Sequence, residues 1–193
     1  WTTMAVALDV TLACSDAAGI ALAQAAIPVA TDNCDVDVAN IVEVAGAFVP
    51  GMTCPEEGTY TNTWTVTDAC GNISDVYTQV ITITDNTAPA WSTMAGALDA
   101  TLECSDAAGI ALAQAAIPVA TDNCDVDVTN IIEIAGAFVP GMTCPQEGTY
   151  TNTWTVTDAC GNISNVYTQV ITITDNTSPT WTTMAGALDV SLE

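Results

Sequence analysis

The chain has 193 residues, of which 23 are Asp or Glu and none is Lys, Arg or His, so its formal net charge is −23. A chain without basic side chains cannot neutralise phosphates, which excludes nucleic acid as a partner. Half of the residues are hydrophobic (50%), enough to build a packed core despite the charge. We therefore expect folded modules with an acidic surface.

Hydrophobic alternation and turn residues predict the elements of the first 90 residues. Residues 7–13 alternate and predict a strand. Residues 20–27 are rich in alanine, and their pattern leaves helix and strand open; we favour a short helix or helical turn. Residues 36–47 predict one or two strands, and residues 60–66 (YTNTWTV) and 76–83 (VYTQVITI) predict two more. Short strands separated by turns indicate an antiparallel β-sandwich.

An internal repeat organises the whole sequence. Residues 1–90 align with residues 91–180 without a gap, and most differences are mild, such as Val42 against Ile132. About 90 residues suits one small all-β domain. We therefore expect two domains, 1–90 and 91–180, followed by the start of a third repeat at 181–193, and we expect the chain to be a segment of a longer array.

Four cysteines recur in each copy. An even number repeated in register is typical of a disulfide framework and of an oxidising compartment. Zinc is the competing interpretation, but zinc sites usually use closely spaced Cys or His pairs, and these cysteines lie 16 to 20 residues apart. The eight cysteines are Cys14, Cys34, Cys54, Cys70, Cys104, Cys124, Cys144 and Cys160.

The residue types and the apolar runs argue against catalysis and membrane insertion. Without His, Lys and Arg, the chain has no imidazole base, Schiff-base lysine or phosphate clamp. Only a carboxylate pair of the glycosidase kind remains, and a near-perfect duplication would need two such sites. The longest apolar stretch, residues 17–30, is too short to span a bilayer. We predict that the chain is not an enzyme and that this segment does not enter a membrane.

Three strings carry a family resemblance: TDNC at 31–34, YTNTWTVTDACGN at 60–72 and ITDNTAP at 83–89. They resemble the HYR-type immunoglobulin-like repeats of large bacterial surface proteins, in particular the cysteine-bearing repeats of SprB-type gliding-motility adhesins. The resemblance covers essentially the whole repeat period. It implies tandem Ig-like antiparallel β-sandwich modules stacked into a fibre, an extracellular or cell-surface location, and no enzymatic activity.

Three functional interpretations remain open at this stage. We favour a structural or adhesive module in the shaft of a bacterial surface adhesin or filament, with neighbouring repeats of the same array as its partners. The second interpretation is a filament subunit that self-assembles by exchanging strands between modules. The third is a repeat that binds surface polysaccharide, or other fibres, through its exposed side chains.

An Ig-like order places the cysteines at the two ends of each module. Cys14 ends the first strand and Cys54 precedes a turn at the same end, while Cys34 and Cys70 lie in loops at the other end. A disulfide needs Cα atoms within about 7 Å, so pairing at the same end is favoured. The favoured pairs are Cys14–Cys54, Cys34–Cys70, Cys104–Cys144 and Cys124–Cys160, and the alternative for the first copy is Cys14–Cys34 with Cys54–Cys70.

Acidic loops predict a calcium site where the two copies meet. The linker that leaves the first copy is expected to enter the second copy at the end that holds its TDNCD and DACGN loops. Calcium prefers six to eight oxygens from carboxylates and carbonyls, which these segments supply. The alternative is that Asp and Asn serve here as ordinary turn residues. The predicted ligands are Asp85, Asn86, Asp122, Asn123, Asp125, Asp127 and Asp158.

Overall fold

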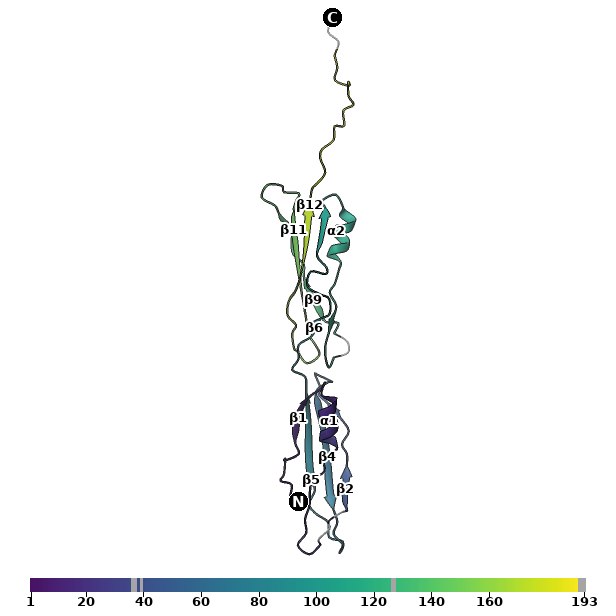
Figure 1. Ribbon diagram of the computed structural model, residues 1–193, viewed down its shortest axis with the longest axis vertical. Coiled ribbons are helices and arrows are strands. Elements are labelled where there is room, and N and C mark those ends of the chain that lie inside the picture. The colour runs from purple at the N-terminus through teal and green to yellow at the C-terminus, as the bar shows by residue number, and fades with distance from the viewer. Residues whose placement is uncertain (36–37, 39, 126–127, 191–193) are drawn as a thin grey trace. The chain divides into compact units, whose positions relative to one another are not determined.

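The computed structural model of the protein describes residues 1–35, 38, 40–125 and 128–190. The described chain is rich in strands and carries one short helix in each repeat, which confirms the predicted all-β class with a short helix in each module (Figure 1). Neither of the two helices in the described residues reaches the length and apolar character that crossing a lipid bilayer requires.

The first repeat forms one five-stranded sheet and one helix. Its elements are β1 (Val10–Ala13), α1 (Ala17–Gln24), β2 (Ile41–Val44), β3 (Val49–Pro50), β4 (Gly58–Val66) and β5 (Tyr77–Thr84). The strand order is β1-β5-β4-β2, and β3 also pairs with β4. β1 runs parallel to β5, with Val10 opposite Ile81 and Ala13 opposite Thr84. The chain therefore leaves β1 and β5 at the same end of the sheet, which places Cys14 beside the start of the linker.

The second repeat has the same plan, with an additional two-stranded sheet formed by β6 and β8. Its elements are β6 (Ala90–Trp91), β7 (Ala100–Glu103), α2 (Ala107–Gln114), β8 (Ala120–Thr121), β9 (Ile131–Ile134), β10 (Val139–Pro140), β11 (Gly148–Val156) and β12 (Tyr167–Thr174). The five-stranded sheet has the order β10-β11-β12-β7, with β9 paired to β11. The parallel pair is again the first and last long strands, β7 and β12.

The described chain divides into two compact units whose boundaries cut across the second repeat. The first unit comprises Trp1–Met94, Pro118–Glu133 and Trp154–Tyr167. The second unit comprises Ala95–Ile117, Ile134–Thr153 and Thr168–Glu193. The linker after β5 and the loops that follow β8 and β11 consequently belong to the same unit as the whole first repeat.

The helix occurs slightly earlier than the sequence predicts. Asp16 caps its N-terminus, because the Asp16 carboxylate accepts a hydrogen bond of 2.8 Å from the Gly19 backbone N–H. Alanine then favours the helical conformation until Gln24. The expectation of a short helix is confirmed, and the helix begins at Ala17, three residues before the predicted start.

The core of the first repeat lies on one face of β4 and β5. Alternate residues of β5 are buried, and Trp64 of β4 is 1% exposed, with its ring centroid 6.0 Å from that of Tyr77. Tyr77 also contacts the ring of Trp1, and its hydroxyl donates to the Met4 carbonyl at 2.9 Å. The N-terminal segment and α1 therefore pack across this face and cover one side of the sheet.

A buried amide network occupies the centre of this face. Gln79 has no exposed surface, and its Nε2 donates to the carbonyls of Leu8 at 2.9 Å and Ala23 at 3.0 Å. Its Oε1 accepts from Asn62 Nδ2 at 3.0 Å, while Asn62 Oδ1 accepts from the Gly46 N–H at 2.9 Å. The network ties the N-terminal segment and α1 to both central strands. Gln169 and Asn152 make the same bonds in the second repeat.

Candidate functional site

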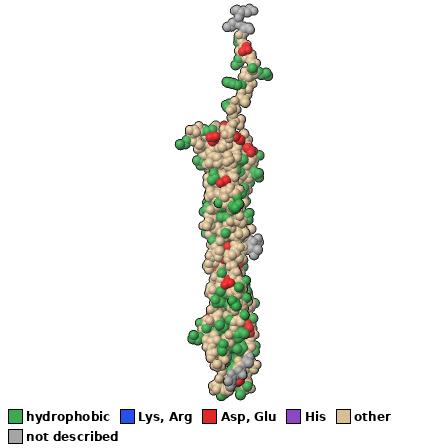
Figure 2. All heavy atoms as spheres, viewed as in Figure 1, with side chains coloured by type: hydrophobic (Ala, Val, Ile, Leu, Met, Phe, Trp, Pro, Cys, Tyr) green, Lys and Arg blue, Asp and Glu red, His purple; other side chains and the backbone are tan. Residues whose placement is uncertain are grey.

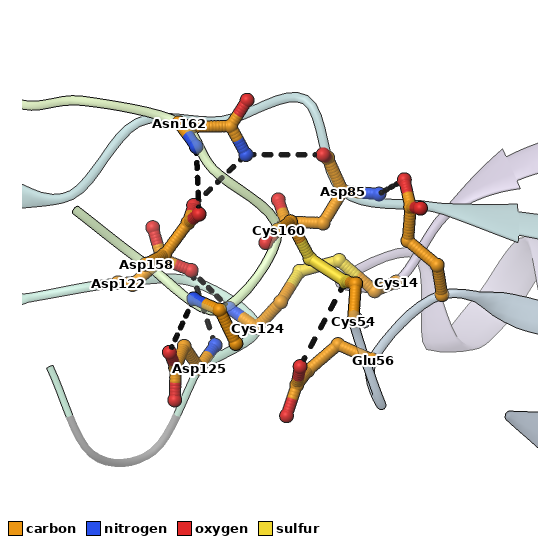
Figure 3. Close-up of a disulfide and its surroundings, with 12 residues drawn as sticks. Cys14, Cys54, Glu56, Asp85, Asp122, Cys124, Asp125, Asp158, Cys160 and Asn162 are labelled. Atoms are coloured by element: carbon orange, nitrogen blue, oxygen red, sulfur yellow. Dashed lines mark hydrogen bonds between the residues drawn. A yellow bond between two sulfur atoms is a disulfide. The ribbon is translucent and has the colours of Figure 1, made fainter. Parts of the chain in front are cut away.

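Two disulfides join the end of the first repeat to loops of the second, within the first compact unit. Cys14, which follows β1, is bonded to Cys124, with Cα atoms 5.8 Å apart. Cys54 is bonded to Cys160, with Cα atoms 4.6 Å apart. We call these two bridges, the linker at residues 85–89 and the loops at 121–125 and 157–163 the junction (Figure 3).

The predicted pairing within each repeat is corrected by this geometry. The structure forms none of the four predicted pairs, and the four cysteines outside the junction are free thiols. The predicted pairs were Cys14–Cys54, Cys34–Cys70, Cys104–Cys144 and Cys124–Cys160. The prediction placed the cysteines at the appropriate ends but considered partners only within one repeat. Cys14 and Cys54 do lie at one end, where each faces a loop cysteine of the next repeat. The free thiols are Cys34, Cys70, Cys104 and Cys144.

Three carboxylates converge beside the two bridges. Asp85 follows β5, Asp122 follows β8 and Asp158 follows β11, so each comes from a different segment. One carboxylate oxygen from each lies within 4.8 Å of the others. Asp85 is 3% exposed and Asp158 is 7% exposed, while Asp122 is half-buried. We call these three residues the acidic triad.

Local hydrogen bonds hold each triad carboxylate from one side. Asp122 Oδ1 accepts from the backbone N–H groups of Cys124 at 2.9 Å and Asp125 at 3.1 Å. Asp158 accepts from the backbone and side-chain nitrogens of Asn162, at 2.7 and 2.8 Å. Asn162 Nδ2 also donates to the Asp85 backbone carbonyl at 3.1 Å, which connects the linker to the loop (Figure 3).

Two triad oxygens are buried without a hydrogen-bond partner among the described residues. They are Oδ2 of Asp85 and Oδ2 of Asp122. Asp85 Oδ1, in contrast, accepts from the Thr87 N–H at 3.2 Å. A buried carboxylate oxygen without a donor is costly, and no Lys, Arg or His exists in the chain to supply one.

Burial raises the pKa of the Asp85 carboxyl, and the nearby carboxylates of Asp122, Asp158 and Glu56 raise it further, against the hydrogen bond from Thr87. A folded-state pKa above the unfolded value means that the folded protein binds this proton more tightly than the unfolded chain does. The resulting stability is present below the unfolded pKa and is lost as the pH rises through the folded pKa. Burial and the neighbouring carboxylates therefore disfavour the charged form of the Asp85 carboxyl in the folded protein, which is what its raised pKa expresses.

The structure brings together only part of the predicted calcium ligand set. Asp85, Asp122 and Asp158 converge. Asn86 and Asn123 are exposed, and Asn123 Nδ2 lies 3.1 Å from Cys124 Sγ. Two predicted ligands remain. Asp125 is not part of the convergent group, and its Oδ2 accepts from the Ala159 N–H at 3.2 Å. Asp127 lies outside the described residues.

The loop at residues 31–35 of the first repeat corresponds to the loop at 121–125, and it shows how this loop is built outside the junction. Asp32 Oδ1 accepts from the N–H groups of Cys34 and Asp35 at 2.9 and 3.0 Å, as Asp122 does in the second repeat. Here, however, Asp32 and Cys34 are exposed and Asp68 is only half-buried. The loop conformation is therefore built by its own residues, and the burial at the junction is contributed by the segment that contacts it.

Sequence reasoning missed two features of the junction. Pairing across the repeats was not considered, although the parallel pairing of first and last strands points to it. The role of Asn162 was also missed; the signal was its place four residues after Asp158, a spacing that lets the amide bind the carboxylate.

Acidic side chains are spread over the face drawn in Figure 2, with apolar side chains between them and no basic side chain. Among the described residues, the buried carboxylates are those of Asp85 and Asp158, and both belong to the triad. The junction combines covalent bridges with the one group of three carboxylates that the described residues bury together.

Comparison with known proteins identifies the family of the chain. Among solved structures, the chain is similar to the crystal structure of human mucin-like protocadherin EC1-2, at 11% sequence identity and a TM-score of 0.28, over 77% of this chain and 92% of that one. No curated protein matches the chain. The family model described as "HYR-like domain with 4 cysteines" matches twice, at residues 2–83 and 92–173. The chain therefore belongs to the family of HYR-like domains with four cysteines and contains two copies of that domain.

Proposed function

We propose that the chain is a structural segment of an extracellular, adhesion-type repeat array whose consecutive HYR-like domains are joined covalently at each junction. The observation that carries this proposal is the pair of bridges from Cys14 to Cys124 and from Cys54 to Cys160. A peptide linker alone leaves neighbouring domains free to move relative to one another. Two additional bonds resist that movement and pass a pulling force from one domain to the next.

Both the chemistry and the repeat favour an extracellular role. Structural disulfides persist in oxidising surroundings and are rare in the cytosol. The junction residues of the two copies differ only at Ala88, which is Ser178 in the second copy, so an array can lengthen by adding repeats that each contact only their neighbours. The residue types offer no imidazole base, Schiff-base lysine or phosphate clamp, which agrees with a mechanical role. The resemblance to SprB-type adhesin repeats supports the shaft of a bacterial surface adhesin as the setting.

The free cysteines favour a second candidate, which is end-to-end assembly of separate chains. Cys34 and Cys70 occupy the positions that Cys124 and Cys160 hold in the second repeat, and Cys104 and Cys144 correspond to Cys14 and Cys54. The two sets are thus the two halves of a junction, and such a head-to-tail contact does not close on itself. Oxidised chains that run as a ladder on a non-reducing gel support this candidate, and a single band opposes it.

Cyanogen bromide mapping tests the proposed function, because trypsin has no site in a chain without Lys or Arg. Cleavage after methionine distributes the cysteines over four fragments, two in each. These fragments are 5–52 with Cys14 and Cys34, 53–94 with Cys54 and Cys70, 95–142 with Cys104 and Cys124, and 143–184 with Cys144 and Cys160.

The fragment masses without reduction identify the pairing directly. We expect fragment 5–52 joined to 95–142, and fragment 53–94 joined to 143–184. Fragment 5–52 joined to 53–94 would mean pairing within the repeat and would contradict the proposal. Four separate fragments that each keep an internal bridge would also contradict it.

A further inference from the structure

We propose that the acidic triad of Asp85, Asp122 and Asp158 binds a calcium ion, which completes the disulfide-linked junction; this inference rests on the proposed function. The two buried oxygens without partners, one on Asp85 and one on Asp122, are the observation that separates this cluster from ordinary surface acids. Asp85 is 3% exposed, so water has little access to satisfy it.

The geometry suits a shared ion. Calcium ligands lie about 2.3–2.6 Å from the ion, so two oxygens on opposite sides of it are about 4.6–5.2 Å apart. The triad oxygens all lie within 4.8 Å of one another. Backbone N–H groups and Asn162 hold Asp122 and Asp158 from the other side, so these carboxylates are already oriented before an ion arrives.

The donor set selects a hard cation. Three carboxylates supply oxygens only, and calcium and magnesium prefer such ligands. The sulfurs beside the triad belong to disulfides, so they are not thiolates that could attract zinc. Calcium tolerates irregular geometry and a mixture of carboxylate, carbonyl and water ligands, whereas magnesium requires a near-octahedral arrangement. Two buried acids and one half-buried acid, in a chain without a single basic side chain, give the ion its electrostatic driving force.

The chain supplies its own control for diffuse binding to acidic surface. Asp32, Asp68 and Asp175 are the counterparts of Asp122, Asp158 and Asp85, and they have the same immediate sequence neighbours. Asp32 and Asp175 are exposed and Asp68 is half-buried. A counterion atmosphere acts on both groups alike, whereas a bound ion requires the buried group.

The test compares D85N, D122N and D158N with D32N, D68N and D175N in the oxidised two-repeat chain. Unfolding by urea is followed in 0.1 M NaCl, once with EDTA and once with 10 mM CaCl2. A dissociation constant of about 10⁻⁴–10⁻³ M, typical of extracellular calcium modules, raises the folding equilibrium constant by roughly 10- to 100-fold. We expect this gain for the wild type and the three control variants, and its loss in each triad variant.

D85N gives a second signature, which a purely structural role of the side chain does not produce. Asn keeps the oxygen that accepts from Thr87 but removes the charge, so the variant should be more stable than the wild type in EDTA and indifferent to calcium. Equal calcium responses in triad and control variants would overturn the site and leave only diffuse binding.

Failure of this inference and failure of the proposed function are distinguishable in the same samples. The cyanogen bromide fragments report the bridges whether or not calcium binds. Cross-linked fragments without a site-specific calcium response leave the proposed function standing and remove only the ion. Bridges within the repeats remove the proposed function itself.

Discussion

Replacing Cys124 and Cys160 by serine is expected to destabilise the chain more than any other pair of conservative substitutions. Each bridge closes a loop of more than 100 residues, with sequence separations of 110 and 106. In the chain-entropy model a loop of that length contributes about 4–5 kcal/mol to the free energy of unfolding. The second bridge adds somewhat less than the first, because the first already shortens the path between its ends. We expect a loss of about 3–4 kcal/mol for C124S or C160S alone, and about twice that for both.

The first repeat provides the matched control for this pair. Cys34 and Cys70 occupy the same loop positions but are exposed free thiols. The variant C34S/C70S should therefore change the free energy of unfolding by less than about 0.5 kcal/mol. Urea titrations of the oxidised proteins at one pH measure both variants. Equal losses for the two pairs would mean that each repeat contains its own bridges.

The next largest effect is expected for Gln79→Leu. The side chain is fully buried, and its amide bonds the Leu8 and Ala23 carbonyls and Asn62. Leucine has a similar volume but leaves those groups without partners, and each unsatisfied buried group costs about 1–3 kcal/mol. We expect a loss of about 3–5 kcal/mol in the free energy of unfolding of the first unit.

Two further variants make the Gln79 result interpretable. Thr78→Ala removes the exposed neighbour on the same strand and should cost less than about 0.5 kcal/mol. Gln169→Leu removes the equivalent network in the second repeat and should reproduce the effect there. A loss below about 1 kcal/mol for both leucine variants would show that the network does not stabilise the repeat.

The strands that carry the core were predictable, and the buried amides were not. Alternation in YTNTWTV and VYTQVITI predicts β4 and β5 because threonines and apolar residues take opposite faces. Gln79 lies among the alternate residues of β5 that face the core, where the sequence pattern predicts an apolar side chain. Its partners Leu8 and Ala23 are distant in sequence. The burial of the Gln79 amide is therefore understood only once α1 and the N-terminal segment are seen to pack against β5.

At the candidate site too, one feature was predictable from the sequence and another was not. Turn chemistry and the position of the linker predicted that Asp85, Asp122 and Asp158 would meet, and the structure brings them together. Which cysteine bonds to which depends on distances across the linker, and spacing in one repeat carries no such information. A local sequence pattern thus located both halves of the junction but not the bonds between them.

Stretching single chains held by their two ends tests the central claim that consecutive repeats are joined covalently. In the oxidised chain the force passes through the bridge from Cys14 to Cys124, so the stretched length excludes a segment of 110 residues. At roughly 3.5 Å per residue, the fully unfolded oxidised chain should be about 380 Å shorter than the reduced chain. Pairing of Cys14 with Cys54 and of Cys104 with Cys144 would hide only about 80 residues, or roughly 280 Å. A difference near the larger value is the expected result, and one near the smaller value would contradict the covalent junction.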